Sequence, residues 1–309
     1  MPLIRCGVST RCLKYLSMGV SMCAFLRSML VVASIFFFAG ILQAGQSRQL
    51  PYYGSEFYKN ISYGMNNENL KQDLRFILES FHKVNNGNYD EVGKSCDGQC
   101  YQHVSIGYDQ ARVFMMGVYY LVDNGHGNYA IPDMYCDTLR DAHEFVNGSA
   151  PAPNQIPDGN IVNTEHTWPQ SKFTGRYDRR MQKSDLHHLF PTDNEMNSIR
   201  GNNPFGIVAR PTKTLKCPVS KFGRATNSGA DVFEPPKGHK GNVARALFYF
   251  SVRYDIPIDE KQEVILRQWH AEDPVNDEEI RRNDAIQKIQ GNRNPFIDHP
   301  ELVGMINNF

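Results

Sequence analysis

The sequence predicts an α+β fold, mostly helical, built as a single domain around a short strand–loop–strand–helix unit. Three observations support this prediction: helical patterns lie on both sides of the chain's centre, the centre is polar and rich in turn residues, and two short strand patterns there precede a short helix. The 309 residues are 41% hydrophobic and 11% aromatic, which is enough for a substantial core and excludes a wholly disordered chain.

The N-terminal segment has the pattern of a secretory signal. Residues 1–44 contain basic but no acidic side chains, and Arg27 precedes the apolar run Met29–Leu42, which ends near the small residue Ala44. The run is shorter than the roughly 20 apolar residues of a transmembrane helix. We therefore expect a signal peptide over 1–44 and a domain over 45–309, in the periplasm or outside the cell, without stable membrane association after processing. An uncleaved anchor is the alternative.

Four cysteines follow that segment, namely Cys96, Cys100, Cys136 and Cys217. An even number of cysteines in an exported chain predicts two disulfides, and three pairings are open. A local bridge between Cys96 and Cys100 would leave Cys136 to join Cys217. A zinc site formed by Cys96, Cys100 and His103 is the alternative, but it lacks a second pair of ligands at zinc spacing.

The charge is balanced overall but not along the chain. The sequence has 33 basic and 33 acidic residues, whereas residues 165–224 hold eleven Lys and Arg against five Asp and Glu. This distribution excludes a uniformly polycationic binder. It predicts a phosphate-attracting face in the middle of the chain.

Helices are expected on each side of this basic segment. Apolar residues at helical spacing, acids near helix starts and a Gly after the last pattern predict helices over Asn67–Val84, Tyr108–Val122, Asn242–Tyr254, Asp259–His270 and Asp277–Gln290. The Pro-rich stretch 149–159 is either an interdomain linker or a loop within one domain.

The central segment supplies the remaining elements. Ile161–Phe173 begins as a strand that Pro169 must end, and Ser184–Pro191 predicts a second strand. The sequence from Thr192 to Glu195 matches a capping box, in which the Thr hydroxyl caps a helix and the Glu reaches back. That helix can run only to about Arg200, because Gly201 follows.

These parts suit hydrolysis of a phosphodiester. His166 is a candidate general base, and Glu165 and Asn197 are oxygen donors suited to one Mg²⁺ ion. Adjacent strand residues face opposite ways, so the strand must end or bulge for Glu165 and His166 to share a site. Three arginines of the loop between the strands could grip the phosphate: Arg176, Arg179 and Arg180.

Four motifs resemble the bacterial endonuclease I family: NTEHTWPQSKF, SDLHHLFPTDNEMNSIRGNNPFG, FEPPKGHKGNVARALFYFSVRYD and QGNRNPFIDHPE. That family comprises periplasmic or secreted non-specific nucleases of the ββα-metal (His-Me finger) superfamily. The resemblance implies a finger at about 160–202, with Glu165 and Asn197 as metal ligands, His166 as general base and a loop arginine on the phosphate. It also implies that the Pro-rich stretch is internal to one mixed α/β domain.

The resemblance implies cleavage of double- and single-stranded DNA, and of RNA, through backbone contacts without base specificity. Mg²⁺ is the expected metal, and Mn²⁺ or Ca²⁺ would suit the same donors. Lys240 and Arg245, at the entrance of the 242–254 helix, are further phosphate candidates. We expect a monomer. The alternatives are an exported nucleic-acid-binding protein without catalysis and a metal-dependent phosphodiesterase acting on small substrates.

Overall fold

A computed structural model describes residues 49–309 except residues 126 and 227, so the expected signal peptide over 1–44 lies outside the described residues. The helices are α2 Gly54–Ser62, α3 Asn67–Glu79, α4 Tyr108–Phe114, α5 Arg179–Ser184, α6 Asn194–Arg200, α7 Lys240–Tyr254, α8 Glu260–Glu272, α9 Asp277–Gln290 and α10 Pro295–Asp298. The strands are β1 Phe81–Lys83, β2 Glu91–Gly93, β3 Cys100–Tyr101, β4 Val122–Gly125, β5 Asn128–Asp133, β6 Thr138–Asp141, β7 Val162–His166, β8 Leu189–Asp193, β9 Val208–Pro211, β10 Lys221–Ala225 and β11 Asp231–Glu234. The predicted α+β class is confirmed.

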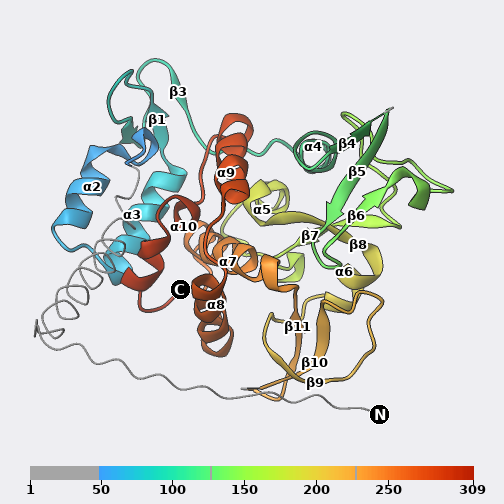
Figure 1. The fold of residues 1–309 in the computed structure, drawn as a ribbon. Coiled ribbons are helices and arrows are strands. Elements are labelled where there is room, and N and C mark those ends of the chain that lie inside the picture. The colour runs from blue at the N-terminus through green and yellow to red at the C-terminus, as the bar shows by residue number, and fades with distance from the viewer. Residues whose placement is uncertain (1–48, 126, 227) are drawn as a thin grey trace, which may run out of the picture. The chain divides into compact units, whose positions relative to one another are not determined.

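Helix α7 forms the centre of the core. All of its residues except Lys240 are buried, including the polar side chains of Asn242, Arg245 and Arg253. Figure 1 shows α8, α9 and α10 arranged about α7, and α3 and α8 pack directly against it. Trp168, Phe250 and Trp269 belong to the same buried cluster, which joins the helical part to the end of β7.

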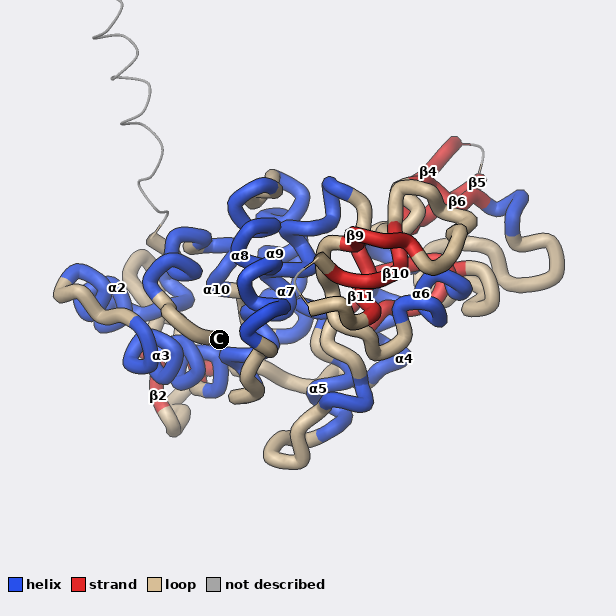
Figure 2. Tube along the Cα trace, turned by 90° about the horizontal axis from the view of Figure 1, so that it is seen from below, coloured by secondary structure: helices blue, strands red, loops and turns tan. Residues whose placement is uncertain are grey.

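The strands form small antiparallel sheets. Their orders are β2-β1-β3, β4-β5-β6, β11-β10-β9 and β7-β8. Figure 2 shows β4–β6 and β9–β11 gathered at one end of this part of the chain, with α2 and α3 at the other. None of the helices in the described part combines the length and the apolar character needed to cross a bilayer.

The three C-terminal helix predictions are confirmed. Asp259 accepts hydrogen bonds from Lys261 N and Gln262 N at the start of α8. Asn276 and Glu279 form a capping box on α9, and Gly291 closes that helix in the left-handed conformation.

Two other helix predictions are too long. The helix expected over Asn67–Val84 ends at Glu79, because Ser80 is extended and Phe81–Lys83 pairs with β2 and β3. The helix expected over Tyr108–Val122 is α-helical only to Phe114 and continues as a π-helical turn to Tyr119.

The Pro-rich stretch packs against that π-helical turn. Asn154 N donates a hydrogen bond to the Gly117 carbonyl at 2.9 Å. A Cβ at Gly117 would lie 2.6 Å from the backbone N and O of Gln155, so only glycine permits this approach. Residues 149–159 therefore contact the same body as the helix before them.

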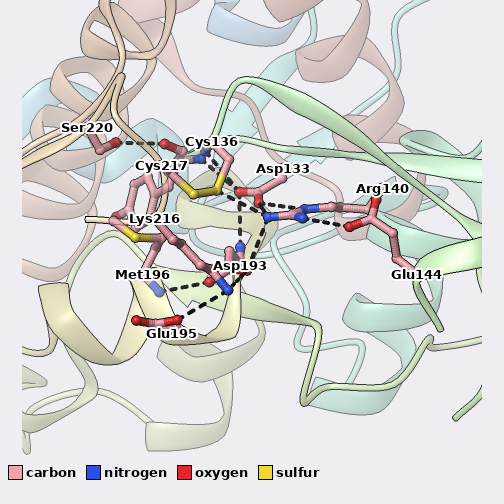
Figure 3. The surroundings of a disulfide bond; sticks show 11 residues. Asp133, Cys136, Arg140, Glu144, Asp193, Glu195, Met196, Lys216, Cys217 and Ser220 are labelled. Carbon is pink, nitrogen blue, oxygen red and sulfur yellow. Dashed lines mark hydrogen bonds and ion pairs between the residues drawn. A yellow bond between two sulfur atoms is a disulfide. The ribbon is translucent and has the colours of Figure 1, made fainter. Parts of the chain in front are cut away.

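Two disulfides are present, Cys96–Cys100 and Cys136–Cys217. Of the three possible pairings, this is the one that contains the local bridge. The zinc alternative at Cys96, Cys100 and His103 is therefore wrong, because disulfide sulfurs cannot act as thiolate ligands. Figure 3 shows the longer-range bridge beside a buried charge cluster, in which Arg140 contacts Asp133 Oδ2 at 2.9 Å and Asp193 Oδ2 at 3.2 Å.

One buried histidine gives a pH prediction. Burial, together with the charges of Arg282 and Arg245, lowers the pKa of His239 to about 3. At pH values below the ordinary pKa of histidine, the unfolded chain binds a proton at this residue that the folded chain does not bind. The free energy of unfolding therefore falls as the pH falls. The contribution approaches about 1.4 kcal/mol per pH unit.

We expect His239→Leu to reduce this acid sensitivity in urea unfolding measured from about pH 8 down to about pH 4.5. The comparison of slopes separates the proton effect from any packing loss, which lowers stability equally at all pH values. An unchanged slope in His239→Leu would contradict the prediction.

Candidate active site

The candidate site is carried by the β7–β8 hairpin and helix α6. The strands pair antiparallel from Val162 opposite Asp193 to His166 opposite Leu189, and α6 follows β8 without a loop. The strand–loop–strand–helix order expected from the sequence is therefore present. Helix α6 ends at Arg200, as predicted.

Two local details differ from the prediction. The second strand begins at Leu189 rather than at Ser184, because Leu186–His188 forms a 3₁₀ turn capped by Asp185, which accepts from His187 N at 3.1 Å. The helix cap is Asp193, which accepts from Met196 N at 3.0 Å, and not Thr192. The expected capping box is therefore wrong.

The side chain of Glu195 does not reach back to the start of α6. It lies 3.4 Å from Lys216 Nζ, which also contacts Asp193 Oδ2 at 2.6 Å. Asp193 thus contacts the cations Lys216 and Arg140 through Oδ2 and caps α6 through Oδ1.

Glu165, His166 and Asn197 line one cavity of about 420 Å³. Strand β7 ends at His166, which meets the condition that adjacent Glu165 and His166 can share a site only where the strand stops. The other lining residues are Tyr108, Asn163, Thr164, Pro169, Gln170, Ser171, Arg200, Gly201 and Asn202. The three residues that sequence reasoning selected are therefore brought together.

The hydrogen bonds of His166 define its tautomer. The Nε2 atom lies 3.1 Å from the Lys183 carbonyl oxygen, which can only accept, so the ring hydrogen is on Nε2. Nδ1 then carries the lone pair, and the Gln170 side-chain amide lies 3.4 Å from it. The basic nitrogen is thus on the side of the ring that Gln170 contacts.

The surroundings of His166 favour the neutral ring. Burial lowers its pKa well below the ordinary value, and the neighbouring His188, the Lys183 side chain and Arg200 add to this effect. The rings of Tyr108 and His188 each lie 5.4 Å from the His166 ring. At neutral pH the imidazole is therefore available to accept a proton.

Glu165 is fully buried and paired with Arg200. Arg200 Nη1 lies 2.6 Å from Glu165 Oε1, and the same guanidinium donates to the carbonyls of His166 at 2.8 Å and Thr167 at 2.6 Å. Both side chains are only 2% exposed. Burial raises the pKa of Glu165, while the Arg200 charge opposes that rise.

The donor set fits a hard divalent cation. Asn197 Nδ2 donates to the Thr164 carbonyl at 3.1 Å, which leaves its Oδ1 as the group able to bind a cation. Glu165 contributes a carboxylate to the same cavity, and the Arg200 charge offsets part of the cost of its burial. Few protein oxygens and several waters are the usual shell of Mg²⁺.

A second group has metal-ligand geometry but not metal-ligand chemistry. The ligand atoms of Asp133, Cys136 and Cys217 lie within 4.8 Å of one another. The two sulfurs are joined in a disulfide, and Asp133 is already bound by Arg140 and by backbone N–H groups. This group therefore stabilises the fold in the oxidised protein.

The three loop arginines differ in their partners. Arg176 pairs with Asp255 at 2.6 Å, and Arg180 pairs with Asp178 at 3.1 Å. Arg179 instead donates to the Gln170 carbonyl at 3.3 Å and lies over the Phe173 ring. Of the three, Arg179 is thus the one attached to residues that contact His166.

The two C-terminal candidates for phosphate binding, Lys240 and Arg245, both form ion pairs within the protein. Lys240 Nζ lies 2.6 Å from Glu234 Oε1. Arg245 is 0% exposed and makes a two-bonded pair with Glu279, at 2.7 Å for each bond. A buried, doubly paired guanidinium is not placed to meet a ligand from solvent.

Sequence reasoning missed Gln170, Lys183 and Tyr108. Gln170 and Lys183 contact His166 directly, and Tyr108 comes from α4, far away in the sequence. His187 and His188 are both buried, and the His188 ring lies 5.4 Å from the His166 ring.

Comparison with known proteins gives related nucleases. The model of the family described as Endonuclease I matches residues 67–301. The chain is 37% identical over 163 residues to an extracellular ribonuclease of Bacillus subtilis (strain 168), covering 47% of this chain and 53% of that protein. It is 33% identical over 118 residues to an extracellular deoxyribonuclease of Aeromonas hydrophila, covering 38% and 49%.

A third relative is Endonuclease-1 of Buchnera aphidicola subsp. Acyrthosiphon pisum (strain APS), 34% identical over 119 residues, with 37% of this chain and 44% of that protein covered. The chain spans about half the length of the curated relatives it matches.

The Arg200–Glu165 pair gives a stability prediction. Arg200→Met leaves the Glu165 carboxylate buried without its partner, so we expect a loss of about 3–5 kcal/mol in the free energy of unfolding. Adding Glu165→Gln removes the stranded charge and should recover part of the loss. Urea unfolding of the two single variants and the double variant, all in chelator, measures the coupling. Purely additive losses would contradict the pairing.

Proposed function

This chain belongs to the endonuclease I family, and from the geometry of its site we propose that it is a metal-dependent endonuclease that hydrolyses phosphodiester bonds of nucleic acids. The observation that carries the proposal is the meeting of His166, Glu165 and Asn197 in one cavity at the end of β7. In this interpretation the β7–β8 hairpin and α6 are a ββα-metal finger within a nuclease domain over 45–309.

His166 acts as the general base. Its Nε2–H is fixed by the Lys183 carbonyl, so Nδ1 takes the proton of the attacking water. The Gln170 amide is close enough to Nδ1 to keep the ring oriented, and the water displaces that long contact. The lowered pKa of His166 keeps the ring in the accepting form at neutral pH.

Glu165 and Asn197 would hold one divalent cation, with Mg²⁺ as the natural occupant and Mn²⁺ or Ca²⁺ as ions that suit the same oxygens. When bound, the ion neutralises the phosphate and the leaving oxygen. Arg200 holds the Glu165 carboxylate in place, and its charge opposes the rise in the pKa of Glu165 that burial causes. The Asn197 amide is oriented by Thr164, so its oxygen needs no rearrangement to bind.

Arg179 is the loop arginine that we propose for the phosphate. It is exposed, has no carboxylate within 4.0 Å among the described residues, and lies beside Gln170 and Phe173. Arg176 and Arg180 already neutralise Asp255 and Asp178, so they are weaker choices. We leave Lys240 and Arg245 out of the phosphate set because their charges are taken up by Glu234 and Glu279.

The proposed substrates are DNA, double- or single-stranded, and RNA. Relatives of the chain carry the names extracellular ribonuclease and extracellular deoxyribonuclease, which supports both classes. The short helix α6 is engaged with the cavity and offers no row of side chains for base edges, so the contacts would be to the backbone. A place outside the cytoplasm, in the periplasm or the medium, fits the names of these extracellular relatives and the two disulfides. A monomer is the form that we propose.

The first test is His166→Ala. Activity on plasmid DNA and on RNA should fall by about 10²–10⁴, because the general base is lost. Binding of DNA in chelator should stay close to that of the parent, and the variant should still unfold cooperatively, with a lower midpoint because a buried ring is lost. Near-parent turnover would remove His166 from this role, and no cleavage by the parent with any divalent metal would overturn the proposal.

The second test is a Mg²⁺ titration of cleavage by the parent and by Asn197→Ala. We expect the variant to need at least tenfold more Mg²⁺ for half-maximal rate, since one of two protein oxygens is gone. Ser198→Ala, one residue along the same helix and exposed, is the matched control. An Asn197→Ala enzyme with the parent's metal response would exclude Asn197 as a ligand.

A further inference from the structure

The segment between β7 and β8 holds cations of two kinds. Arg176 and Arg180 are paired with carboxylates, as described above. Lys172, Arg179 and Lys183 have no carboxylate partner within 4.0 Å in the part of the chain that the structure describes. Their charges are therefore the ones available to an anion near His166.

Lys183 is tied to the general base through its own backbone. Its carbonyl accepts from His166 Nε2 at 3.1 Å, so the Lys183 side chain starts at a fixed distance from the base. The ammonium Nζ lies 4.2 Å from the centre of the Tyr108 ring. A cation–π contact holds an ammonium in position without cancelling its charge.

Tyr108 contacts this ammonium and also lines the cavity. Its ring lines the cavity with His166, and the two ring centres are 5.4 Å apart. The helices that carry the pair are packed together, and the Ser105 and Ser184 hydroxyls are 2.9 Å apart at their junction. The relative position of Tyr108 and Lys183 is thus set by the fold.

We propose that Lys183 and Tyr108 form a nucleotide-binding subsite beside His166, in which the ammonium binds a backbone phosphate and the aromatic ring stacks on the base of the same nucleotide. The inference rests on the proposed nuclease function and names the part of the substrate that Lys183 and Tyr108 would bind. The favoured ligand is a single-stranded nucleotide, because a base must be unpaired to lie on the ring.

This arrangement gives Lys183 a role beside His166, although Lys183 has no carboxylate partner among the described residues. Because the Lys183 carbonyl is hydrogen-bonded to His166, a phosphate bound to the Lys183 side chain would lie close to His166. The same phosphate neutralises an ammonium whose contact in the described part of the chain is an aromatic ring and not a carboxylate. The ammonium and the ring together would bind one nucleotide, at its phosphate and at its base.

The test uses Lys183→Met and Tyr108→Leu, with Lys183→Arg and Tyr108→Phe as conservative partners. Replacing the lysine side chain keeps the carbonyl that orients His166. Lys288→Met is the matched control, because Lys288 is an exposed lysine on α9 that lines a different cavity. Binding of a labelled single-stranded oligonucleotide is measured in chelator over a range of salt, and kcat and KM are measured with Mg²⁺.

We expect Lys183→Met to raise Kd and KM about tenfold and to reduce the salt slope of binding by about 0.7, the value for one phosphate contact on a single strand. Tyr108→Leu should raise Kd by about tenfold, and Tyr108→Phe should stay close to the parent. Lys183→Arg should retain the salt slope, and Lys288→Met should behave as the parent.

Two results would overturn the subsite. One is a folded Lys183→Met variant with the parent's Kd and salt slope; the other is a fall in kcat alone, which would mean that Lys183 acts only through His166. Either result leaves the nuclease proposal standing if the parent cleaves. If the parent binds but does not cleave, the nuclease proposal fails, while the chelator binding data still decide the subsite. If Lys183→Met does not fold, the salt slope of Lys183→Gln decides.

Discussion

The buried guanidinium of Arg200 is the contact on which the site depends. It joins the last turn of α6 to the Glu165 carboxylate and to the carbonyls of His166 and Thr167, where β7 stops. A strand that continued would turn Glu165 and His166 to opposite faces. By taking the backbone acceptors that a strand partner would use, Arg200 lets the chain leave the sheet with both side chains at one cavity.

Two further buried groups hold the ends of this unit. Asp185 accepts from the Tyr249 and Tyr254 hydroxyls of α7, at 2.7 and 2.8 Å, and fixes the turn before β8 to the core helix. At the other end, Asp193 caps α6 and meets Arg140 beside the Cys136–Cys217 disulfide. The unit formed by β7, β8 and α6 is therefore held at each end of β8. Such rigid support would suit the cation site that we propose, to which the protein supplies two oxygens.

The sequence predicted those elements whose information is local. The helices α7, α8 and α9 have their own periodicity and caps, and β7, α6 and the residues Glu165, His166 and Asn197 lie in two neighbouring motifs. The sheets β4–β6 and β9–β11 were not predicted, because short strands are defined by their partners more than by their own pattern. Tyr108 and the Lys183 carbonyl were not predicted as parts of the site for a related reason. Tyr108 comes from a helix far away in the sequence, and Lys183 acts through a backbone atom that every residue possesses.

The basic excess of 165–224 lies in the segment that supplies most of the residues lining the cavity, but formal charge does not show which cations are free to meet a ligand. Several of these cations are paired within the protein. Arg200 neutralises Glu165, Arg176 and Arg180 hold nearby aspartates, and Lys216 supports the helix cap. What remains for a polyanion is the small set without carboxylate partners, and Arg179 and Lys183 of that set are attached to groups that contact His166. Subtracting the internal ion pairs therefore reduces a diffuse positive segment to a few cations, two of which are attached to groups next to His166.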